Sequence, residues 1–171
     1  MPDKVYSNAA WYPIEIAGLK RELPVCKLSD EVSIAGFVIF GDVEMTVRCA
    51  EELLKRVPEH DILVTAESKG IPLIHEMARQ EGAQTYVVAR KGPKLYMKDP
   101  FFVEVQSIST AKAQKLYLDE TEAAKLKGRR VLIVDDVIST GESLAAMEDL
   151  VKQFGGNIVG RACVLAEGDA A

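Results

Sequence analysis

Uninterrupted apolar runs alternate with amphipathic stretches along most of this chain. Continuous runs of this kind are typical of strands that are buried on both faces of a sheet. Between them, apolar residues recur every three or four positions, which is the spacing of a helix with one buried face. The predicted strands are 32–40, 62–66, 85–89, 131–134 and 158–165, and the predicted helices are 43–57, 72–82 and 144–154.

Residues that start or stop helices flank the predicted helices. Asp42 is a suitable N-cap for the first helix, and Pro58 ends it. Pro72 lies in the first turn of the second helix, where a missing N–H is not needed. Strand and helix therefore alternate at least three times. We predict an α/β fold with a central, mostly parallel sheet and helices on both faces.

Length and composition favour a single globular domain over residues 1–171. A hydrophobic content of 48% is typical of a folded chain rather than a disordered one. The net charge of −5 argues against a nucleic-acid partner held by bulk electrostatic attraction.

The sequence shows no signal for export or membrane insertion. No apolar run approaches the roughly 20 residues of a membrane span, and the first residues lack the apolar core of a signal peptide. Cys26, Cys49 and Cys163 lie far apart in apolar surroundings, which favours reduced thiols over disulfides or a metal site. We therefore expect a soluble, cytoplasmic protein with no membrane partner.

Three polar segments each follow a predicted strand. They are Glu67-Ser68-Lys69-Gly70, residues 90–95 and residues 135–143. Ligands of parallel sheets bind beyond the carboxyl ends of the strands. We therefore expect these segments to meet at one edge of the sheet and to form the functional site.

The stretch Ser139-Thr140-Gly141-Glu142-Ser143 is a small polar turn that leads into a helix. Such a turn offers free backbone amides and the positive end of the helix dipole, an arrangement that holds a phosphate. The hydroxyls of Thr140 and Ser143 would be additional donors. On these five residues alone, an ordinary N-cap turn remains the alternative.

Asp135 and Asp136 follow the aliphatic run directly. Adjacent carboxylates that leave a buried strand lose hydration and repel each other unless a ligand or a cation occupies them. They can accept hydrogen bonds from the vicinal hydroxyls of a ribose, or help to hold Mg²⁺ through water. A nucleotide hydrolase would need the pattern G-x-x-x-x-G-K-[ST] upstream, and the sequence lacks it. The acids and the turn together predict a ribose-phosphate site.

Residues 131–143 resemble the 13-residue phosphoribosyl-pyrophosphate signature of type I phosphoribosyltransferases: an aliphatic run, two acids, two intervening residues, then small-Thr-Gly and a small residue. Residues 66–70 look like the pyrophosphate-binding loop of adenine and xanthine phosphoribosyltransferases, and residues 90–95 resemble the basic loop of the adenine enzymes. The resemblance covers roughly 32–165. It implies the type I phosphoribosyltransferase fold, with residues 1–31 as a small N-terminal hood that covers the base.

The resemblance also implies an activity, which is transfer of ribose 5-phosphate from phosphoribosyl pyrophosphate to a purine base, with release of pyrophosphate, in purine salvage. Asp135, Asp136 and Lys69 are the implied catalytic residues. Mg²⁺ is the implied cofactor, held through the two acids and the pyrophosphate rather than by a fixed all-protein site. The implied phosphoribosyl-pyrophosphate-binding residues are Glu67, Ser68, Lys69, Gly70, Arg90, Lys91, Lys94, Asp135, Asp136, Ser139, Thr140, Gly141, Glu142 and Ser143.

Two further features follow from the resemblance. The family places a mobile two-stranded flap in the region of residues 101–118, with Lys112 as the residue expected to reach the pyrophosphate when it closes. The basic loop of similar enzymes often reaches a neighbouring subunit, so a homodimer is implied.

The choice of base stays open in the sequence. The basic loop favours an adenine phosphoribosyltransferase-like enzyme, whereas the longer flap is closer to xanthine phosphoribosyltransferases. A second alternative is a non-catalytic regulator that binds phosphoribosyl pyrophosphate. Regulators of that kind usually carry a strongly basic DNA-binding segment, which this acidic sequence does not show.

Overall fold

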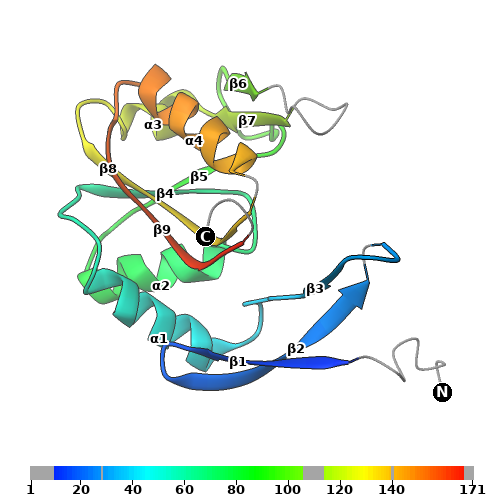
Figure 1. Ribbon diagram of the computed structural model, residues 1–171. Coiled ribbons are helices and arrows are strands. Elements are labelled where there is room, and N and C mark those ends of the chain that lie inside the picture. Colours follow the sequence, from blue (N-terminus) through cyan, green and yellow to red (C-terminus); the bar gives the residue numbers. More distant parts are fainter. Residues whose placement is uncertain (1–9, 28, 106–113, 140, 168–171) are drawn as a thin grey trace. The chain divides into compact units, whose positions relative to one another are not determined.

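The computed structural model describes residues 10–27, 29–105, 114–139 and 141–167. The chain forms two compact units, Met1–Val38 and Ile39–Ala171 (Figure 1). The boundary lies a little after the end of the predicted N-terminal segment 1–31. No helix in the described ranges is long and apolar enough to cross a membrane.

The first unit is an antiparallel sheet of three strands in the order β1-β2-β3. Its strands are β1 (Trp11–Ile16), β2 (Leu19–Lys27) and β3 (Ser33–Ala35). Ala17 and Gly18 join β1 to β2 with positive φ angles of 52° and 78°. A two-residue turn of this conformation has the twist that suits a tight hairpin.

The predicted strand over 32–40 is wrong in both length and partner. Only Ser33–Ala35 is a strand, and it pairs antiparallel with β2 instead of joining a parallel sheet. After it, burial alternates: Phe37 and Ile39 are buried, but Val38 and Phe40 are 54% and 55% exposed. An apolar run does not reveal which of its residues will find a partner, so the pattern alone suggested a longer buried strand.

The second unit is an α/β structure around a parallel sheet with the order β5-β4-β8-β9. Helices α1 and α2 lie on one side of this sheet, and α3 and α4 lie on the other (Figure 1). The strands are β4 (Ile62–Ala66), β5 (Val87–Ala89), β8 (Arg130–Ile138) and β9 (Asn157–Ala166), and the helices are α1 (Val43–Leu54), α2 (Ile71–Glu81), α3 (Glu120–Ala124) and α4 (Glu142–Gln153). The predicted fold class is confirmed.

The local sequence signals act as predicted. The Asp42 carboxylate accepts a hydrogen bond from the Met45 amide at 3.0 Å and caps α1. Pro72 lies in the first turn of α2. The four residues of the run Val131–Val134 are all buried, because helices cover both faces of β8. Burial of each such side chain contributes about 1.5–3 kcal/mol to the stability of the fold, relative to leaving it exposed.

A hairpin of β6 (Phe101–Val105) and β7 (Gln114–Leu118) occupies the region where a two-stranded flap was expected. Its antiparallel pairing confirms the two strands. Tyr117 in β7 also exchanges two backbone hydrogen bonds of 2.8 Å with Arg90, just beyond β5. Lys112 lies outside the described residues, so its role in closure stays a prediction.

Candidate functional site

Strand β8 carries the two acids at its carboxyl end. It was predicted to end at Val134, but it continues to Ile138 because Val137 and Ile138 pair with β9. Asp135 and Asp136 are therefore held in a strand that pairs with β9 at this point, rather than in a loop.

The Asp135 carboxylate is partly buried and accepts hydrogen bonds. Its Oδ1 receives the Asp136 amide at 2.9 Å and the Ser68 hydroxyl at 3.0 Å. Burial raises the pKa of Asp135 to about 6, and the hydrogen bonds from the Asp136 amide and from Ser68 partly oppose this rise. An ionised Asp135 is therefore a charge that the site stabilises incompletely.

Asp136 is more deeply buried, with a relative exposure of 3%. Its Oδ2 finds no hydrogen-bond partner among the described residues, although the Lys69 ammonium lies 3.7 Å away. The buried Thr65 hydroxyl likewise lacks a partner there. Unsatisfied buried polar atoms are rare and often mark a position that a ligand, an ion or water completes.

The loop Glu67–Gly70 connects β4 to α2 and lies against β8. The Gly70 amide donates to the Ser68 hydroxyl at 3.2 Å. A Cβ atom on Gly70 would lie 2.9 Å from Asp135 Oδ1 and 3.1 Å from Thr65 Oγ1, so glycine is required for this close approach. Gly70 is also the N-cap of α2 and makes no side-chain cap, which leaves amides of the first turn available to an anion.

The turn after β8 leads into α4. Gly141 is the N-cap, with a φ of 77° and no side-chain cap. The alternative of an ordinary turn capped by a Ser or Thr side chain therefore does not apply, because the cap residue is a glycine. A small hollow is lined by residues that include Asp135, Ser139, Gly141 and Ser143. Glu142 lies in the first turn of α4, where the helix dipole favours a carboxylate. Thr140 lies outside the described residues.

The basic loop, residues 90–95, reaches the loop after β4 through Glu67. Oε1 of Glu67 lies 3.1 Å from the Lys94 ammonium and 3.5 Å from the Arg90 guanidinium. Oε2 of Glu67 accepts the Lys91 amide at 3.0 Å. The prediction that the three polar segments meet at one edge of the sheet is thus confirmed for the residues described.

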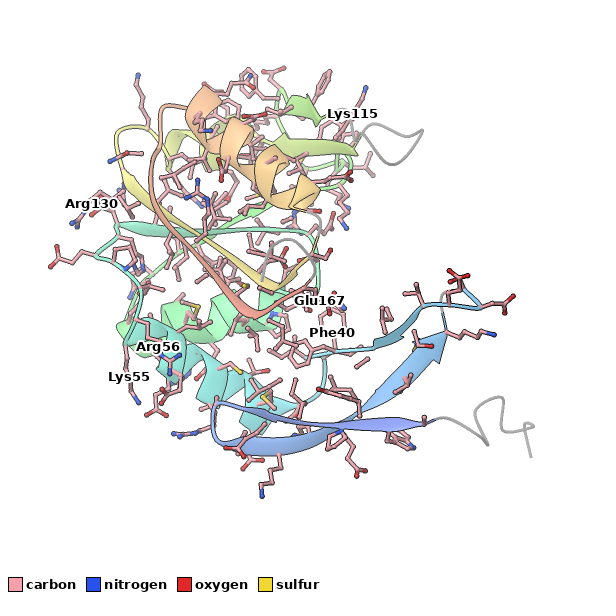
Figure 2. The ribbon with its side chains drawn as sticks, viewed as in Figure 1. Phe40, Lys55, Arg56, Lys115, Arg130 and Glu167 are labelled. Carbon is pink, nitrogen blue, oxygen red and sulfur yellow. The ribbon has the colours of Figure 1, made fainter. Side chains whose placement is uncertain are left out.

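The opposite edge of the sheet carries a different set of polar contacts. Arg130 begins β8 and pairs with Asp61 at 2.8 Å and Glu59 at 3.0 Å. Glu167, by contrast, follows the carboxyl end of β9 (Figure 2). The Glu167 amide donates to the Ile138 carbonyl at 2.8 Å. The Arg130 cluster binds strand ends together and lies away from the acids.

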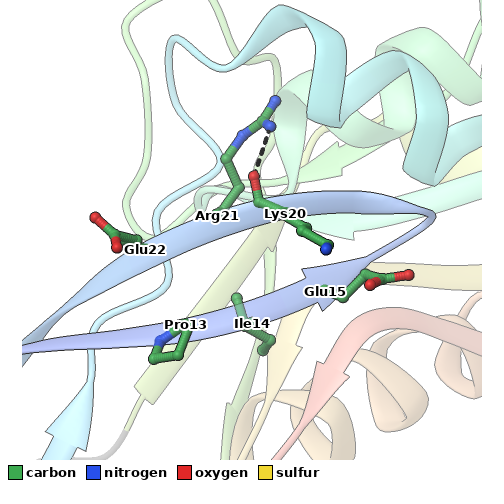
Figure 3. Close-up of a pocket in the computed structure, with 6 residues that line it drawn as sticks. All are labelled: Pro13, Ile14, Glu15, Lys20, Arg21 and Glu22. Carbon is green, nitrogen blue, oxygen red and sulfur yellow. Dashed lines mark hydrogen bonds between the residues drawn. The ribbon is translucent and has the colours of Figure 1, made fainter.

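A separate hollow lies on the β1–β2 hairpin of the first unit (Figure 3). Pro13, Ile14, Glu15, Lys20, Arg21 and Glu22 line it. Its polar side chains carry mixed charges, and the Arg21 guanidinium donates to the Lys20 carbonyl at 3.0 Å. This arrangement does not resemble the set of acids, lysine and amides at the sheet edge.

Sequence reasoning missed two contributors to the site. Thr65 is a hydroxyl inside an otherwise aliphatic strand, and that contrast was a signal that could have drawn attention to it. Tyr117 anchors the start of the basic loop by backbone hydrogen bonds, which carry no sequence signal.

The fold and the site together define an α/β protein with a parallel sheet. The carboxyl ends of its strands carry a site that is suited to a phosphorylated ligand with hydroxyl groups. The chain belongs to the phosphoribosyltransferase family, because the family model described as a phosphoribosyl transferase domain matches residues 46–171.

The relatives are named after two different purine specificities. The chain is 37% identical to a hypoxanthine/guanine phosphoribosyltransferase of Methanocaldococcus jannaschii over 107 residues, which cover 63% of this chain and 54% of that protein. It is 32% identical to an adenine phosphoribosyltransferase of Rhodospirillum rubrum over 120 residues, 69% of this chain and 64% of the relative. The chain thus spans about half to two thirds of the length of these relatives.

Solved structures agree on the fold. The adenine phosphoribosyltransferase of Saccharomyces cerevisiae, crystallised with adenine and an imino-altritol bisphosphate, matches with a TM-score of 0.67. The match covers 92% of this chain and 84% of that protein at 24% identity. The chain therefore has the type I phosphoribosyltransferase fold.

Proposed function

We propose that this protein transfers ribose 5-phosphate from phosphoribosyl pyrophosphate to a purine base and releases pyrophosphate. The observation that carries the proposal is the placement of Asp135 and Asp136 between two helix N-termini that begin with glycine, with Lys69 beside Asp136. Carboxylates suit the ribose hydroxyls, and each helix N-terminus suits a phosphate group. The names of the relatives support a purine as the acceptor.

Each residue has a distinct task in this mechanism. The first turn of α4 binds the 5′-phosphate, and the two acids orient the ribose hydroxyls. As the bond to pyrophosphate breaks, the sugar carbon becomes positively charged and the leaving oxygens become negatively charged. Lys69 and the amides at the start of α2 stabilise these oxygens.

The donor groups at this edge fit Mg²⁺ only in combination with the substrate. No group of three or more His, Cys, Asp or Glu side chains suited to a metal occurs in the described part of the chain. Mg²⁺ commonly uses one or two carboxylates, water and phosphate oxygens, and the unsatisfied Asp136 Oδ2 suits such a role. Asp135 and Asp136 would hold the ion, which neutralises charge on the pyrophosphate when bound.

Adenine is the proposed base, and hypoxanthine or guanine is the second candidate. The basic loop supports adenine, as does the name of the Rhodospirillum rubrum relative. The name of the Methanocaldococcus jannaschii relative supports hypoxanthine and guanine.

A cytoplasmic homodimer is the proposed state of the protein. The three free cysteines suit a reducing compartment. Exposed apolar side chains at the end of the basic loop and after it, among them Leu95, Tyr96 and Phe102, supply apolar surface of the kind that subunits bury.

Pyrophosphate release from phosphoribosyl pyrophosphate and Mg²⁺, measured separately with adenine, hypoxanthine, guanine and xanthine, tests the function. We expect release that depends on the base, with adenine the best acceptor. Replacing both acids, Asp135→Asn with Asp136→Asn, is expected to reduce turnover by at least about 100-fold, the loss typical of removing charge-stabilising groups. Tight binding of phosphoribosyl pyrophosphate without turnover on any purine would instead indicate a regulator.

A further inference from the structure

The Glu67 carboxylate contacts three residues of the basic loop, whereas an isolated surface ion pair joins only two side chains. One carboxylate oxygen lies near both Lys94 and Arg90, and the other accepts the Lys91 amide. Its backbone also extends the sheet, since the Glu67 amide donates to the Ala89 carbonyl at 2.8 Å. Glu67 thus joins the loop after β4 to the loop after β5 at both the backbone and the side chain.

The position of Glu67 is unusual for an acid. It directly precedes Ser68-Lys69-Gly70, where pyrophosphate is proposed to bind, and a carboxylate facing that ligand would repel it. Glu67 is instead surrounded by positive groups. The Lys91 amide, with help from Lys94 and Arg90, holds the pKa of Glu67 below its usual range although burial opposes this, so the side chain is ionised at neutral pH.

We propose that Glu67 is a positioning residue, which acts by fixing the basic loop against the pyrophosphate site and does not itself bind phosphoribosyl pyrophosphate. The inference rests on the proposed function, and it differs from the direct binding role that the sequence resemblance implied for Glu67.

The balance of charge supports this role. The basic loop carries three cations, Arg90, Lys91 and Lys94, against the single charge of Glu67, so a positive surplus remains for the ligand. The Lys91 side chain is exposed, and its amide bond to Glu67 fixes the point from which that side chain extends. Fixing a loop before binding improves affinity because less conformational entropy is lost when the ligand arrives.

The test compares Glu67→Gln and Glu67→Ala with the unaltered protein. Glutamine keeps an oxygen for the Lys91 amide but removes the charge, whereas alanine removes both. Calorimetric titration with phosphoribosyl pyrophosphate plus MgCl₂, and with pyrophosphate plus MgCl₂, measures affinity without turnover. We expect binding weakened about threefold for Gln and at least about tenfold for Ala, in line with the loss of a partly exposed ion pair and of a charge-assisted hydrogen bond.

Steady-state kinetics separates positioning from a general structural effect. We expect KM for phosphoribosyl pyrophosphate to rise in both variants, while kcat at saturation and KM for the purine change less than about threefold. Glu51→Gln is the matched control, because Glu51 on α1 also pairs with one arginine and one lysine, Arg48 and Lys55. It should leave all three constants unchanged.

A double-mutant cycle of Glu67→Ala with Lys94→Ala identifies the route of the effect. If Glu67 acts through the loop, the two losses of affinity are less than additive. Tighter binding by Glu67→Ala would show that Glu67 competes with the ligand for the cations, and unchanged binding by both Glu67 variants would show that it has no role; either result overturns the proposal. Because affinity is measured directly, an inactive but ligand-binding protein would contradict the proposed transferase activity and leave this test intact.

Discussion

Asp135 and Asp136 are neighbours in the chain but have different surroundings. Asp135 accepts two hydrogen bonds at one oxygen, while Asp136 has an oxygen with no hydrogen-bond partner among the described residues and a lysine nearby. The sequence predicts that two adjacent acids need a ligand or a cation. It does not predict the raised pKa of Asp135, because that pKa is raised by burial, which depends on how distant segments pack around the strand.

Replacing Asp135 by Asn is expected to stabilise the fold at neutral pH while it reduces turnover. The pKa of Asp135 rises from 3.8 to about 6 on folding. A tenfold change in proton affinity is worth about 1.4 kcal/mol, and we expect a gain of roughly 1–3 kcal/mol in the free energy of unfolding. Asparagine retains an oxygen for the Ser68 hydroxyl and the Asp136 amide.

The stabilising effect of Asp135→Asn is expected to increase with pH. The contribution of protonated Asp135 to stability is fully present below pH 3.8 and is lost as the pH rises through about 6. Urea unfolding from pH 4 to 7.5 should therefore show little difference between the two proteins near pH 4 and a growing advantage of the variant above it. Asp149→Asn, at an exposed position on α4, is the control. An advantage that does not change with pH would contradict the explanation.

At the scale of secondary structure, the site depends on how closely β4, α2 and β8 approach one another. Ser68 and Gly70, which precede α2 directly, lie against Asp135 of β8. Hydrophobic periodicity predicted the position of α2 and β4 to within one or two residues, because that signal is local. The extension of β8 to Ile138 was not predictable in the same way, since it results from pairing with β9.

The substitution Gly70→Ala tests the close contact between Gly70 and Asp135. The added Cβ would lie within 2.9 Å of Asp135 Oδ1, so the start of α2 or the acid must move. We expect a loss of about 1–3 kcal/mol in the free energy of unfolding, which is typical of overpacking, together with weaker binding of phosphoribosyl pyrophosphate. Chemical denaturation and calorimetry measure the two effects.

The matched control is Gly92→Ala in the basic loop, where an added Cβ meets no atom within 4 Å. It should leave stability within about 0.5 kcal/mol of the original value. Equal effects of the two substitutions would show that the close contact at Gly70 is not the cause.

The molecule as a whole combines a parallel α/β unit with a separate antiparallel sheet. The family match covers residues 46–171 and so lies within the α/β unit. All the described residues proposed to bind phosphoribosyl pyrophosphate belong to this unit. Ligand binding should therefore stabilise the unit that contains most of the hydrophobic core.

Phosphoribosyl pyrophosphate with MgCl₂ is expected to raise the unfolding temperature of the full chain. A ligand at 100 times its Kd adds about 2.7 kcal/mol. For a chain of this length the shift should be roughly 5–10 °C, as measured by differential scanning calorimetry. The variant with both Asp135→Asn and Asp136→Asn should lose most of the shift, whereas Glu51→Gln should keep it. A full shift in the double variant would place the ligand elsewhere.

The sequence by itself determined the features that depend on near neighbours. These are the alternation of strands and helices, the cap at Asp42, the acids after the aliphatic run and the glycine turn before α4. Tertiary structure alone decided the features that need partners from distant segments: the antiparallel pairing of Ser33–Ala35, the full length of β8, the burial that raises the pKa of Asp135 and the contacts of Glu67. Hydrophobic spacing and capping act within a few residues, whereas strand pairing, desolvation and ion pairs depend on which segments the fold brings together.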